Sequence, residues 1–346
     1  MEKILITGSA GFIGYHLVNK LLKENFEVYG IDNINDYYDV NLKYARLAET
    51  GISANENGNL KGNQQYKEIK FGEEIYSTVN TNYLFKRVDV QNKKLLFELF
   101  AAEKFDYVIH LAAQAGVRNS IENPDIYIQS NIIGFFNILE ACRTFPVKKL
   151  LYASSSSVYG NNTKIPFSTN DKTDEPISLY AATKKTNELL AYAYSHLYQI
   201  STIGLRFFTV YGSWGRPDMS PILFADAISQ GIPVKVFNNG EMKRDFTHVS
   251  DIIEGLYRIL QSKKPHEKKH QLFNIGNGNP VDLLEFIRTI EKHLGQKAEL
   301  QFLPMQPGDV KQTWADISNL EEFCNYKPKT CLDEGIKEFV DWYLEY

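Results

Sequence analysis

The sequence predicts an α/β protein built on a doubly wound parallel sheet, with a smaller α/β part interleaved with it. Three observations predict this class: a glycine-rich turn directly after the first apolar run, an acidic residue at the end of the second run, and apolar runs that alternate with helix-length segments as far as residue 211. The chain has 346 residues, about twice the length of a typical domain, so we expect two parts.

The opening segment is expected to form a strand–helix–strand unit. Residues 3–7 (KILIT) are an unbroken apolar run of the kind that a strand buried on both faces requires, and the turn GSAGFIG comes directly after it. A helix is expected at 12–24, and the run FEVYGID at 26–32 predicts the second strand. Further strands are expected at 83–90, 105–113, 148–156 and 201–208, alternating with helices at 93–103, 125–143 and 178–198.

The rest of the chain is less regular. Gly, Pro and Trp in YGSWGRPD, after Tyr211, indicate the start of a second part. The apolar run QLFNIG at 271–276 predicts a strand that returns to the first sheet, so the two parts interleave. Residues 49–82 are rich in Asn and Gly, and we expect a surface insertion there that is partly mobile.

The glycine turn is a candidate dinucleotide site. Gly8, Gly11 and Gly14 carry no side chain that would keep a pyrophosphate from the backbone amides at the start of a helix. Glycines alone also fit a tight strand-to-helix turn, but Asp32 ends the next strand, where a carboxylate accepts hydrogen bonds from an adenosine ribose. Because Asp32 would repel a 2′-phosphate and no Arg occurs within IDNIND, we expect NAD rather than NADP. Asp89, after the third strand, fits either an adenine contact or a helix cap.

Tyr180 and Lys184 are a candidate catalytic pair. They lie four residues apart on a predicted helix and therefore project from one face. About 25 residues earlier a strand ends in four serines, and such strand ends face the crevice where these sheets bind ligands. A surface pair and a polar loop would give the same residues, but the cofactor turn on the same sheet favours a site. A phenol has a pKa near 10, so Tyr180 acts as a base at neutral pH only if the charges of Lys184 and the oxidised nicotinamide favour its phenolate.

The motifs TGSAGFIG, IDN, HLAAQAGVR, SSSSVYG, YAATK, LRFFTVYG and RDFTHVSD together resemble the extended short-chain dehydrogenase/reductases, and within them the nucleotide-sugar 4-epimerases. HLAAQAGVR, LRFFTVYGSWGRPDM and FLPMQPGDV look like UDP-glucuronate 4-epimerases. The resemblance covers nearly the whole chain apart from about 49–82. We therefore expect a Rossmann-type NAD-binding domain at 1–210 plus about 246–276, carrying the insertion at 49–82, and a UDP-sugar-binding domain at 211–245 plus 277–346.

The resemblance implies a role for each matching residue. Tyr180 would be the acid/base, with Ser155 its partner hydroxyl and Ser157 a second candidate. Lys184 would bind the nicotinamide ribose. Cofactor contacts would come from Gly8, Gly11, Phe12, Ile13 and Gly14 at the pyrophosphate, Asp32 and Asn33 at the adenosine ribose, Asp89 and Val90 at the adenine, and Leu111, Ala112, Ala113 and Gln114 along the cofactor. Thr209 would face the sugar diphosphate, and Arg244 would contact the nucleotide phosphates.

The residues just before VYG and just after LRFFTVYG predict the substrate. Dehydratases and decarboxylases of this superfamily place a carboxylate before VYG, whereas this chain has Ser156 and Ser157, which disfavours both reactions. Arg216, in the GRPD turn, is a candidate to grip a sugar carboxylate by two parallel bonds, although a surface loop arginine fits the same position. Many relatives carry an Arg where this chain has Gln306, which leaves Arg244 with more of the diphosphate charge.

We therefore expect an NAD-dependent, redox-neutral inversion of UDP-glucuronate to UDP-galacturonate through a 4-keto sugar. Epimerisation of UDP-glucose or UDP-N-acetylglucosamine is the neighbouring alternative. A UDP-glucuronate decarboxylase and a non-catalytic NAD-binding protein are less favoured, the latter because a binder without chemistry does not need Tyr180, Lys184 and the serines.

The composition and the sequence pattern limit the classes of partner that we expect. Lys and Arg number 38 against 42 Asp and Glu, a net charge of −4, so neither a nucleic acid nor a membrane is expected as partner. Cys142, Cys324 and Cys331 have no metal-ligand spacing, so we expect no metal site and reduced, buried thiols. No signal peptide or long apolar run is seen, which predicts a cytoplasmic protein. The apolar faces of the helices near 125–143 and 178–198 resemble the family's dimer contact and predict a homodimer.

Overall fold

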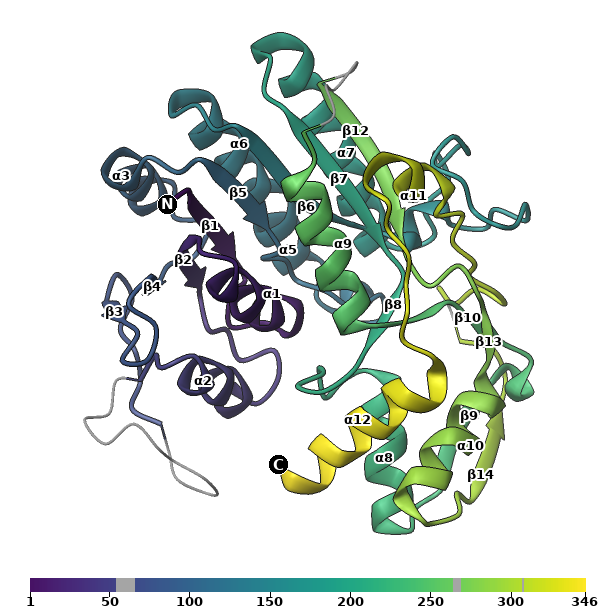
Figure 1. Ribbon diagram of the computed structural model, residues 1–346. Coiled ribbons are helices and arrows are strands. Elements are labelled where there is room, and N and C mark those ends of the chain that lie inside the picture. Colours follow the sequence, from purple (N-terminus) through teal and green to yellow (C-terminus); the bar gives the residue numbers. More distant parts are fainter. Residues whose placement is uncertain (54–65, 264–268, 307) are drawn as a thin grey trace. The chain divides into compact units, whose positions relative to one another are not determined.

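The computed structural model describes residues 1–53, 66–263, 269–306 and 308–346. Within this part of the chain, eight strands form one sheet in the order β12-β7-β6-β5-β1-β2-β4-β3 (Figure 1). The chain divides into two compact units. The first comprises Met1–Ser154, Leu179–Leu205 and Lys264–Leu272, and the second Ser155–Ser178, Arg206–Lys263 and Phe273–Tyr346.

The opening strand–helix–strand unit forms as predicted. Strand β1 (Lys3–Thr7) pairs in parallel with β2 (Glu27–Asp32), in a register that places Thr7 opposite Ile31. Helix α1 (Phe12–Lys23) connects them and buries its apolar stripe. Since four of the five β1 residues are buried, the apolar run reflects a strand covered on both faces.

The first unit continues the predicted alternation. The pairs β1–β5, β2–β4 and β5–β6 are parallel, and α3, α6 and α7 cover the face of the sheet opposite α1 (Figure 1), so the α/β, doubly wound class is confirmed. QLFNIG joins the sheet as strand β12, as expected. The further strands are β4 (Tyr83–Arg87), β5 (Tyr107–His110), β6 (Lys149–Ser155), β7 (Thr202–Phe207) and β12 (His270–Ile275). The further helices are α2 (Val40–Glu49), α3 (Lys93–Glu103), α4 (Asn119–Glu122), α5 (Pro124–Tyr127), η1 (Ile128–Ile133), α6 (Gly134–Thr144) and α7 (Leu179–Tyr198).

The helix predicted at 125–143 forms without a break, but its hydrogen-bonding period changes along its length. It consists of α5, the π-helical segment η1 and α6, and Asn131 lies in the π-helical part. Its side-chain oxygen accepts a hydrogen bond from the Gln114 backbone N–H at 2.7 Å, and its amide donates to the Gln114 carbonyl at 2.9 Å. A cross-element polar bridge of this kind accompanies a local change of helix period, which apolar periodicity does not reveal.

The predicted insertion is only partly covered by the described residues. Residues 54–65 of the expected 49–82 lie outside them. The described remainder contains β3 (Glu74–Tyr76), which pairs with β4 in an antiparallel sense and ends the sheet. This antiparallel edge strand departs from the all-parallel sheet that we predicted, and its three residues are too few to give an alternating pattern.

The second unit contains three short strand pairs. The pairs β8 (Thr209–Tyr211) with β11 (Phe246–His248) and β9 (Val234–Phe237) with β14 (Leu300–Leu303) are parallel, and β10 (Lys243–Arg244) with β13 (Val281–Asp282) is antiparallel. Phe246 stacks on Phe286 with ring centroids 3.9 Å apart, in a buried core that also contains Val236 and Phe339. The helices described in the second unit are η2 (Ser156–Tyr159), α8 (Ser220–Gln230), η3 (Asn238–Gly240), α9 (Val249–Gln261), α10 (Leu283–Leu294), α11 (Ser318–Cys324) and α12 (Leu332–Glu345).

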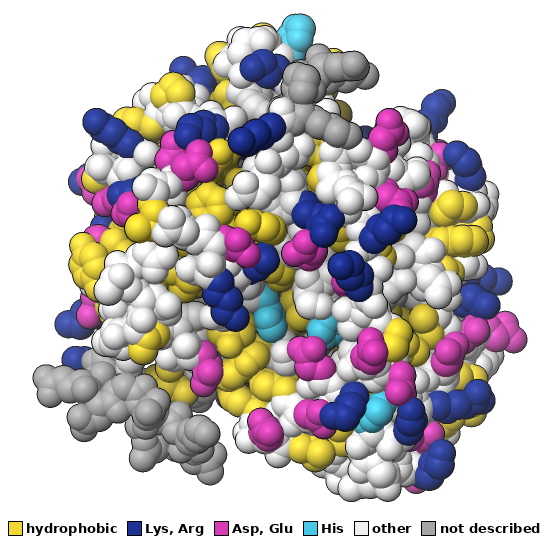
Figure 2. Space-filling view, in the orientation of Figure 1, with side chains coloured by type: hydrophobic (Ala, Val, Ile, Leu, Met, Phe, Trp, Pro, Cys, Tyr) yellow, Lys and Arg dark blue, Asp and Glu magenta, His cyan; other side chains and the backbone are white. Residues whose placement is uncertain are grey.

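The second unit includes residues 155–178, 206–210, 246–263 and 273–276, whereas the sequence analysis places them in the predicted NAD-binding domain. The assignment of a function to each part stays a prediction. On the face drawn in Figure 2, the described Lys and Arg side chains are interspersed with Asp and Glu and form no continuous basic stripe. No helix of the described residues is long and apolar enough to cross a membrane.

Candidate active site

The glycine turn after β1 is shaped for close backbone approach. Gly8 has a φ of +73°, and a Cβ there would lie 2.8 Å from the Ala112 backbone nitrogen. A Cβ on Gly14 would lie 2.0 Å from the Gly8 carbonyl oxygen, so a side chain cannot be accommodated. Gly11 is the N-cap of α1 and supplies no capping side chain, which leaves the first backbone N–H groups of the helix without a side-chain partner at this position. Phe12 and Ile13 begin the helix.

Asp32 and Asn33 lie at the end of β2. Asp32 is 7% exposed, and its carboxylate accepts a hydrogen bond from the Ile34 backbone N–H at 2.8 Å. The Asn33 amide donates to the Asp89 carboxylate at 2.9 Å, so Asp89 is brought to this loop. Asn92, not Asp89, caps α3, which removes the helix-cap interpretation of Asp89. Val90 is buried in the core beneath the loop.

Helix α2 adds two buried cations that our sequence reasoning missed. The Lys43 ammonium donates to the Asn35 side-chain oxygen at 2.8 Å and lies 3.8 Å from the Asp32 carboxylate. Arg46 is fully buried and donates to the Ala10 carbonyl, in the glycine turn, at 3.0 Å. The sequence carries no local signal for either contact, because both depend on how α2 packs against the glycine turn and the end of β2.

Residues Leu111 to Gln114 leave β5 beside the glycine turn. The Leu111 backbone N–H donates to the Thr7 carbonyl at 3.1 Å, and the Ala112 N–H donates to the Thr7 hydroxyl at 3.1 Å. Ala113 comes next and is half-buried. Gln114 is 4% exposed, and its side-chain Nε2 is buried without a hydrogen-bond partner in the described structure. A buried amide donor without a partner leaves a hydrogen bond that a bound group can complete.

Tyr180 and Lys184 lie together on α7, as the spacing predicts. The Lys184 ammonium is 5.9 Å from the centroid of the Tyr180 ring and donates to the Ala153 carbonyl, near the end of β6, at 2.8 Å. Lys184 is 3% exposed, and burial lowers its pKa to about 8. Nearby, burial and the charge of Lys184 lower the pKa of His110 to about 3, so this imidazole is neutral. The Tyr127 ring meets the Tyr180 ring edge to face, with centroids 6.2 Å apart.

The serines at the end of β6 form a short hydrogen-bonded chain in the second unit. Ser155 is the N-cap of η2, and its hydroxyl accepts from the Ser157 backbone N–H at 3.2 Å. The Ser155 and Ser157 hydroxyl oxygens are 2.5 Å apart. Each therefore fixes the direction of the other.

The three predicted substrate residues also lie in the second unit. Thr209 is the first residue of β8, half-buried. Arg216 donates two parallel hydrogen bonds to the Asp218 carboxylate, from Nε at 3.0 Å and from Nη2 at 2.6 Å. Arg244, in β10, donates to the Lys311 carbonyl at 3.2 Å, and burial lowers its pKa.

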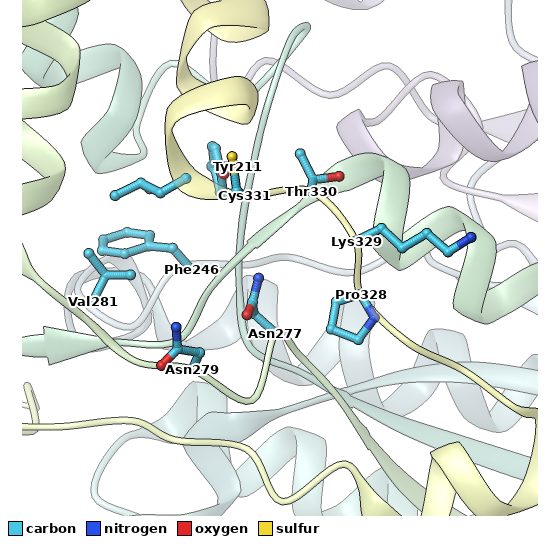
Figure 3. Close-up of a pocket in the computed structure, with 10 residues that line it drawn as sticks. Tyr211, Phe246, Asn277, Asn279, Val281, Pro328, Lys329, Thr330 and Cys331 are labelled. Carbon is cyan, nitrogen blue, oxygen red and sulfur yellow. The ribbon is translucent and has the colours of Figure 1, made fainter.

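A pocket of about 290 Å³ opens in the second unit (Figure 3). None of the predicted substrate residues lines it. The lining includes Cys331, which is exposed, whereas we expected three buried thiols; Cys142 is buried and Cys324 is intermediate. The lining residues are Tyr211, Phe246, Asn277, Asn279, Val281, Pro328, Lys329, Thr330, Cys331 and Leu332.

The sequence model of the NAD dependent epimerase/dehydratase family matches residues 4–276, which is more than half of the chain. The chain belongs to this family. Protein CapI of Staphylococcus aureus is 47% identical over 99% of both chains. A probable UDP-glucuronate 4-epimerase of Rhizobium meliloti is 40% identical over 99% of this chain and 96% of its own.

Among solved structures, the UDP-glucuronic acid 4-epimerase of Bacillus cereus, in complex with UDP-glucuronic acid and NAD, is similar to this chain. Its TM-score is 0.86 at 32% identity, over 99% of each chain. These likenesses confirm the resemblance to nucleotide-sugar 4-epimerases.

The first unit fits the family's cofactor. The glycine turn leaves room where a Cβ would meet backbone, the start of α1 presents N–H groups to an anion, and the buried Gln114 amide lacks a partner. Asp32 offers an acceptor for a ribose diol, and the Lys43 ammonium near it offsets its charge.

Proposed function

We propose that this family member is an NAD-dependent 4-epimerase of UDP-sugars, and that it interconverts UDP-glucuronate and UDP-galacturonate through a 4-keto sugar. The observation that carries this proposal is the buried Lys184 ammonium beside the Tyr180 ring, on a sheet whose first turn fits a pyrophosphate. Full-length similarity to UDP-glucuronate 4-epimerases supports the substrate.

Tyr180 is the proposed acid/base. It takes the proton of the sugar 4-hydroxyl as the ketone forms and returns it when the alcohol is restored. NAD, when bound, takes hydride from carbon 4 and returns it to the opposite face of the sugar. The positive charge of Lys184 favours the Tyr180 phenolate. Because His110 is neutral, it adds no second positive charge that would repel the Lys184 ammonium. Lys184 also binds the nicotinamide ribose in this proposal.

The serine chain supplies the second hydroxyl. Ser155 donates to the reacting 4-oxygen, and Ser157, hydrogen-bonded to it, sets the direction of that donation. Neither side chain can do the work of a carboxylate at carbon 5, which disfavours dehydration and decarboxylation.

The remaining predicted residues are proposed as binding groups. Arg216 holds the sugar carboxylate, Thr209 faces the sugar diphosphate, and Arg244 contacts the nucleotide phosphates. A fixed guanidinium suits the first task, and the Asp218 carboxylate fixes the plane of the Arg216 fork. The proposed cofactor contacts are Gly8, Gly11, Phe12, Ile13, Gly14, Asp32, Asn33, Asp89, Val90, Leu111, Ala112, Ala113, Gln114, Tyr180 and Lys184.

The test is conversion of UDP-glucuronate by the purified protein, with and without added NAD, with chromatography of the nucleotide sugars as the readout. We expect UDP-galacturonate without net NADH, and no product from Tyr180→Phe. Unchanged substrate would refute the proposal, whereas a UDP-pentose with carbon dioxide would indicate a decarboxylase. Faster turnover of UDP-glucose or UDP-N-acetylglucosamine would move the assignment to a neutral sugar.

Arg216→Ala tests the uronate itself. Removing a charge-assisted contact to the sugar carboxylate is expected to lower kcat/KM for UDP-glucuronate roughly 10- to 100-fold, with little change for UDP-glucose, which lacks the carboxylate. Equal losses on the two sugars would contradict the role of Arg216.

We also propose a homodimer formed through α7, in the cytoplasm. On α7 Leu189 is 59% exposed and Tyr192 is 61% exposed, which is a large apolar area for a helix facing water. A second copy of the same helix would cover it.

A further inference from the structure

Residues 66–73, here called the arm, come directly after the undescribed part of the insertion and are tied to the rest of the first unit. The Tyr66 ring stacks on the Tyr44 ring of α2, with centroids 5.8 Å apart and planes 16° apart. The Ile69 backbone N–H donates to the Tyr44 hydroxyl at 3.2 Å, and Ile69 itself is 1% exposed. The arm is therefore a surface segment, with residues 67, 68, 70 and 71 exposed, that is anchored to α2 through Tyr66 and the buried Ile69.

Arg87, the last residue of β4, joins this arm to the loop after β2. Its Nη1 donates to the Ile69 carbonyl at 2.6 Å, and its Nε donates to the Asn33 carbonyl at 3.0 Å. The guanidinium carbon also lies 4.3 Å from the centroid of the Phe71 ring. The Arg87 side chain is only 11% exposed, so its two hydrogen bonds are partly shielded from water, whereas Phe71 is 59% exposed and its ring contact adds less.

The backbone of Arg87 also bonds to the arm. Its carbonyl accepts from the Gly72 N–H at 2.8 Å, and its N–H donates to the Glu73 carbonyl at 3.1 Å. The side-chain pair with Glu68 adds little, because that carboxylate is 74% exposed. One residue thus fixes two parts of the arm and the backbone at Asn33.

The loop at 32–35, here called the ribose loop, is held on its other sides by side chains. The Asn33 side chain bonds to Asp89, and the Asn35 side-chain oxygen accepts from Lys43. Arg87 holds the backbone carbonyl of Asn33 within this set. If Arg87 is lost, that carbonyl loses a charge-assisted hydrogen bond, and the ribose loop loses its link to the arm.

We propose that Arg87 is a positioning residue that couples the arm to the ribose loop and so slows the release of NAD. This inference rests on the proposed function in one respect: a cofactor that is reduced and reoxidised within one turnover has to stay bound until the sugar is restored. A ribose loop already held in its binding geometry loses less conformational freedom when NAD binds. The resulting gain in affinity appears mainly as slower NAD dissociation.

The test compares Arg87→Met with Lys86→Met. Lys86 is the preceding residue of the same strand and pairs with Glu74 at 3.1 Å, so its loss removes a neighbouring cation and leaves Asn33 and Ile69 untouched. The probe is NAD itself: its dissociation from the loaded protein is measured by rapid gel filtration, and its stabilisation of the protein by the shift in Tm. We expect NAD to leave Arg87→Met about tenfold faster, with no change for Lys86→Met.

Two further readouts separate positioning from a general loss of structure. At saturating NAD, kcat of Arg87→Met should stay within about twofold of the parent, because Arg87 touches no reacting group in this proposal. Arg87→Lys keeps the charge and can reach one carbonyl but not both, so its NAD dissociation rate should lie between those of the parent and Arg87→Met, even if Arg87→Met folds poorly.

Equal NAD release from the parent, Arg87→Lys and Arg87→Met would overturn the inference, as would equal acceleration in Lys86→Met. NAD retention is measured without turnover. A parent protein that binds NAD but leaves every UDP-sugar unchanged would therefore refute the proposed function, while the comparison of Arg87 variants would still decide this inference.

Discussion

Replacing Lys184 with Met is expected to make the NAD-free protein more stable while abolishing its activity. Burial lowers the pKa of Lys184 from 10.5 to about 8, and each factor of ten in proton affinity corresponds to 1.36 kcal/mol. The charged form is therefore roughly 3 kcal/mol less favourable in the folded protein than in the unfolded chain. The hydrogen bond to the Ala153 carbonyl returns about 1 kcal/mol, so Lys184→Met should gain roughly 2 kcal/mol at pH 7.

The direction of the Lys184 pKa shift determines how the stability difference between Lys184→Met and the parent changes with pH. Because the folded-state pKa of Lys184 is below the unfolded one, the unfolded chain holds more protons between about pH 8 and pH 10.5. Below pH 8 both states carry the charge and the penalty is complete. As the pH rises, the folded protein loses the charge first and the penalty shrinks. The advantage of the Met variant is gone near pH 10, where the remaining penalty no longer exceeds the hydrogen bond of about 1 kcal/mol.

Urea unfolding of the NAD-free proteins at pH 7 and near pH 10 measures both effects. Lys94→Met is the control, because Lys94 also lies on a helix of the first unit, α3, and its side chain is 86% exposed. We expect the control to change stability little at either pH. A Lys184→Met protein that is less stable than the parent at pH 7, or equally favoured at both pH values, would refute the reasoning.

Two further predictions concern the glycine turn and the exposed face of α7. Gly14→Ala brings a Cβ within 2.0 Å of the Gly8 carbonyl, so we expect loss of NAD retention and destabilisation by about 3 kcal/mol or more, whereas Gly11→Ala, at 3.0 Å from the same oxygen, should be milder. Denaturant unfolding and NAD content check this order, and equal effects would contradict it. Leu189→Glu should convert the proposed dimer to monomer in sedimentation, whereas Leu344→Glu, exposed on α12, should not. A parent protein that is already monomeric would exclude the dimer.

The parts of the fold that the sequence predicted well are those where one local signal decides the structure. The KILIT run and the glycines after it correspond to β1 and the turn before α1 because burial on both faces and close backbone approach each demand a narrow set of residues. Tyr180 and Lys184 could be paired because helical spacing alone brings them together.

The parts that were missed depend on contacts between distant segments. Lys43 near Asp32 depends on how α2 packs, which its residue types do not reveal. The π-helical segment contains Asn131, whose hydrogen-bond partner Gln114 lies 17 residues away in the sequence, so local periodicity does not reveal the contact. Arg87 belongs to a strand in the sequence pattern, and only the packed arm gives it Ile69 as a partner.

The exposed thiol at the start of α12 offers a practical handle for spectroscopy. Cys331 is exposed, whereas burial strongly raises the pKa of the Cys142 thiol and the Cys324 thiol donates to the Leu320 carbonyl at 3.4 Å. Thiol reagents act on accessible thiolates, so a maleimide dye should react first at Cys331 without removal of the other cysteines. The second unit can therefore carry a fluorophore at a single defined point.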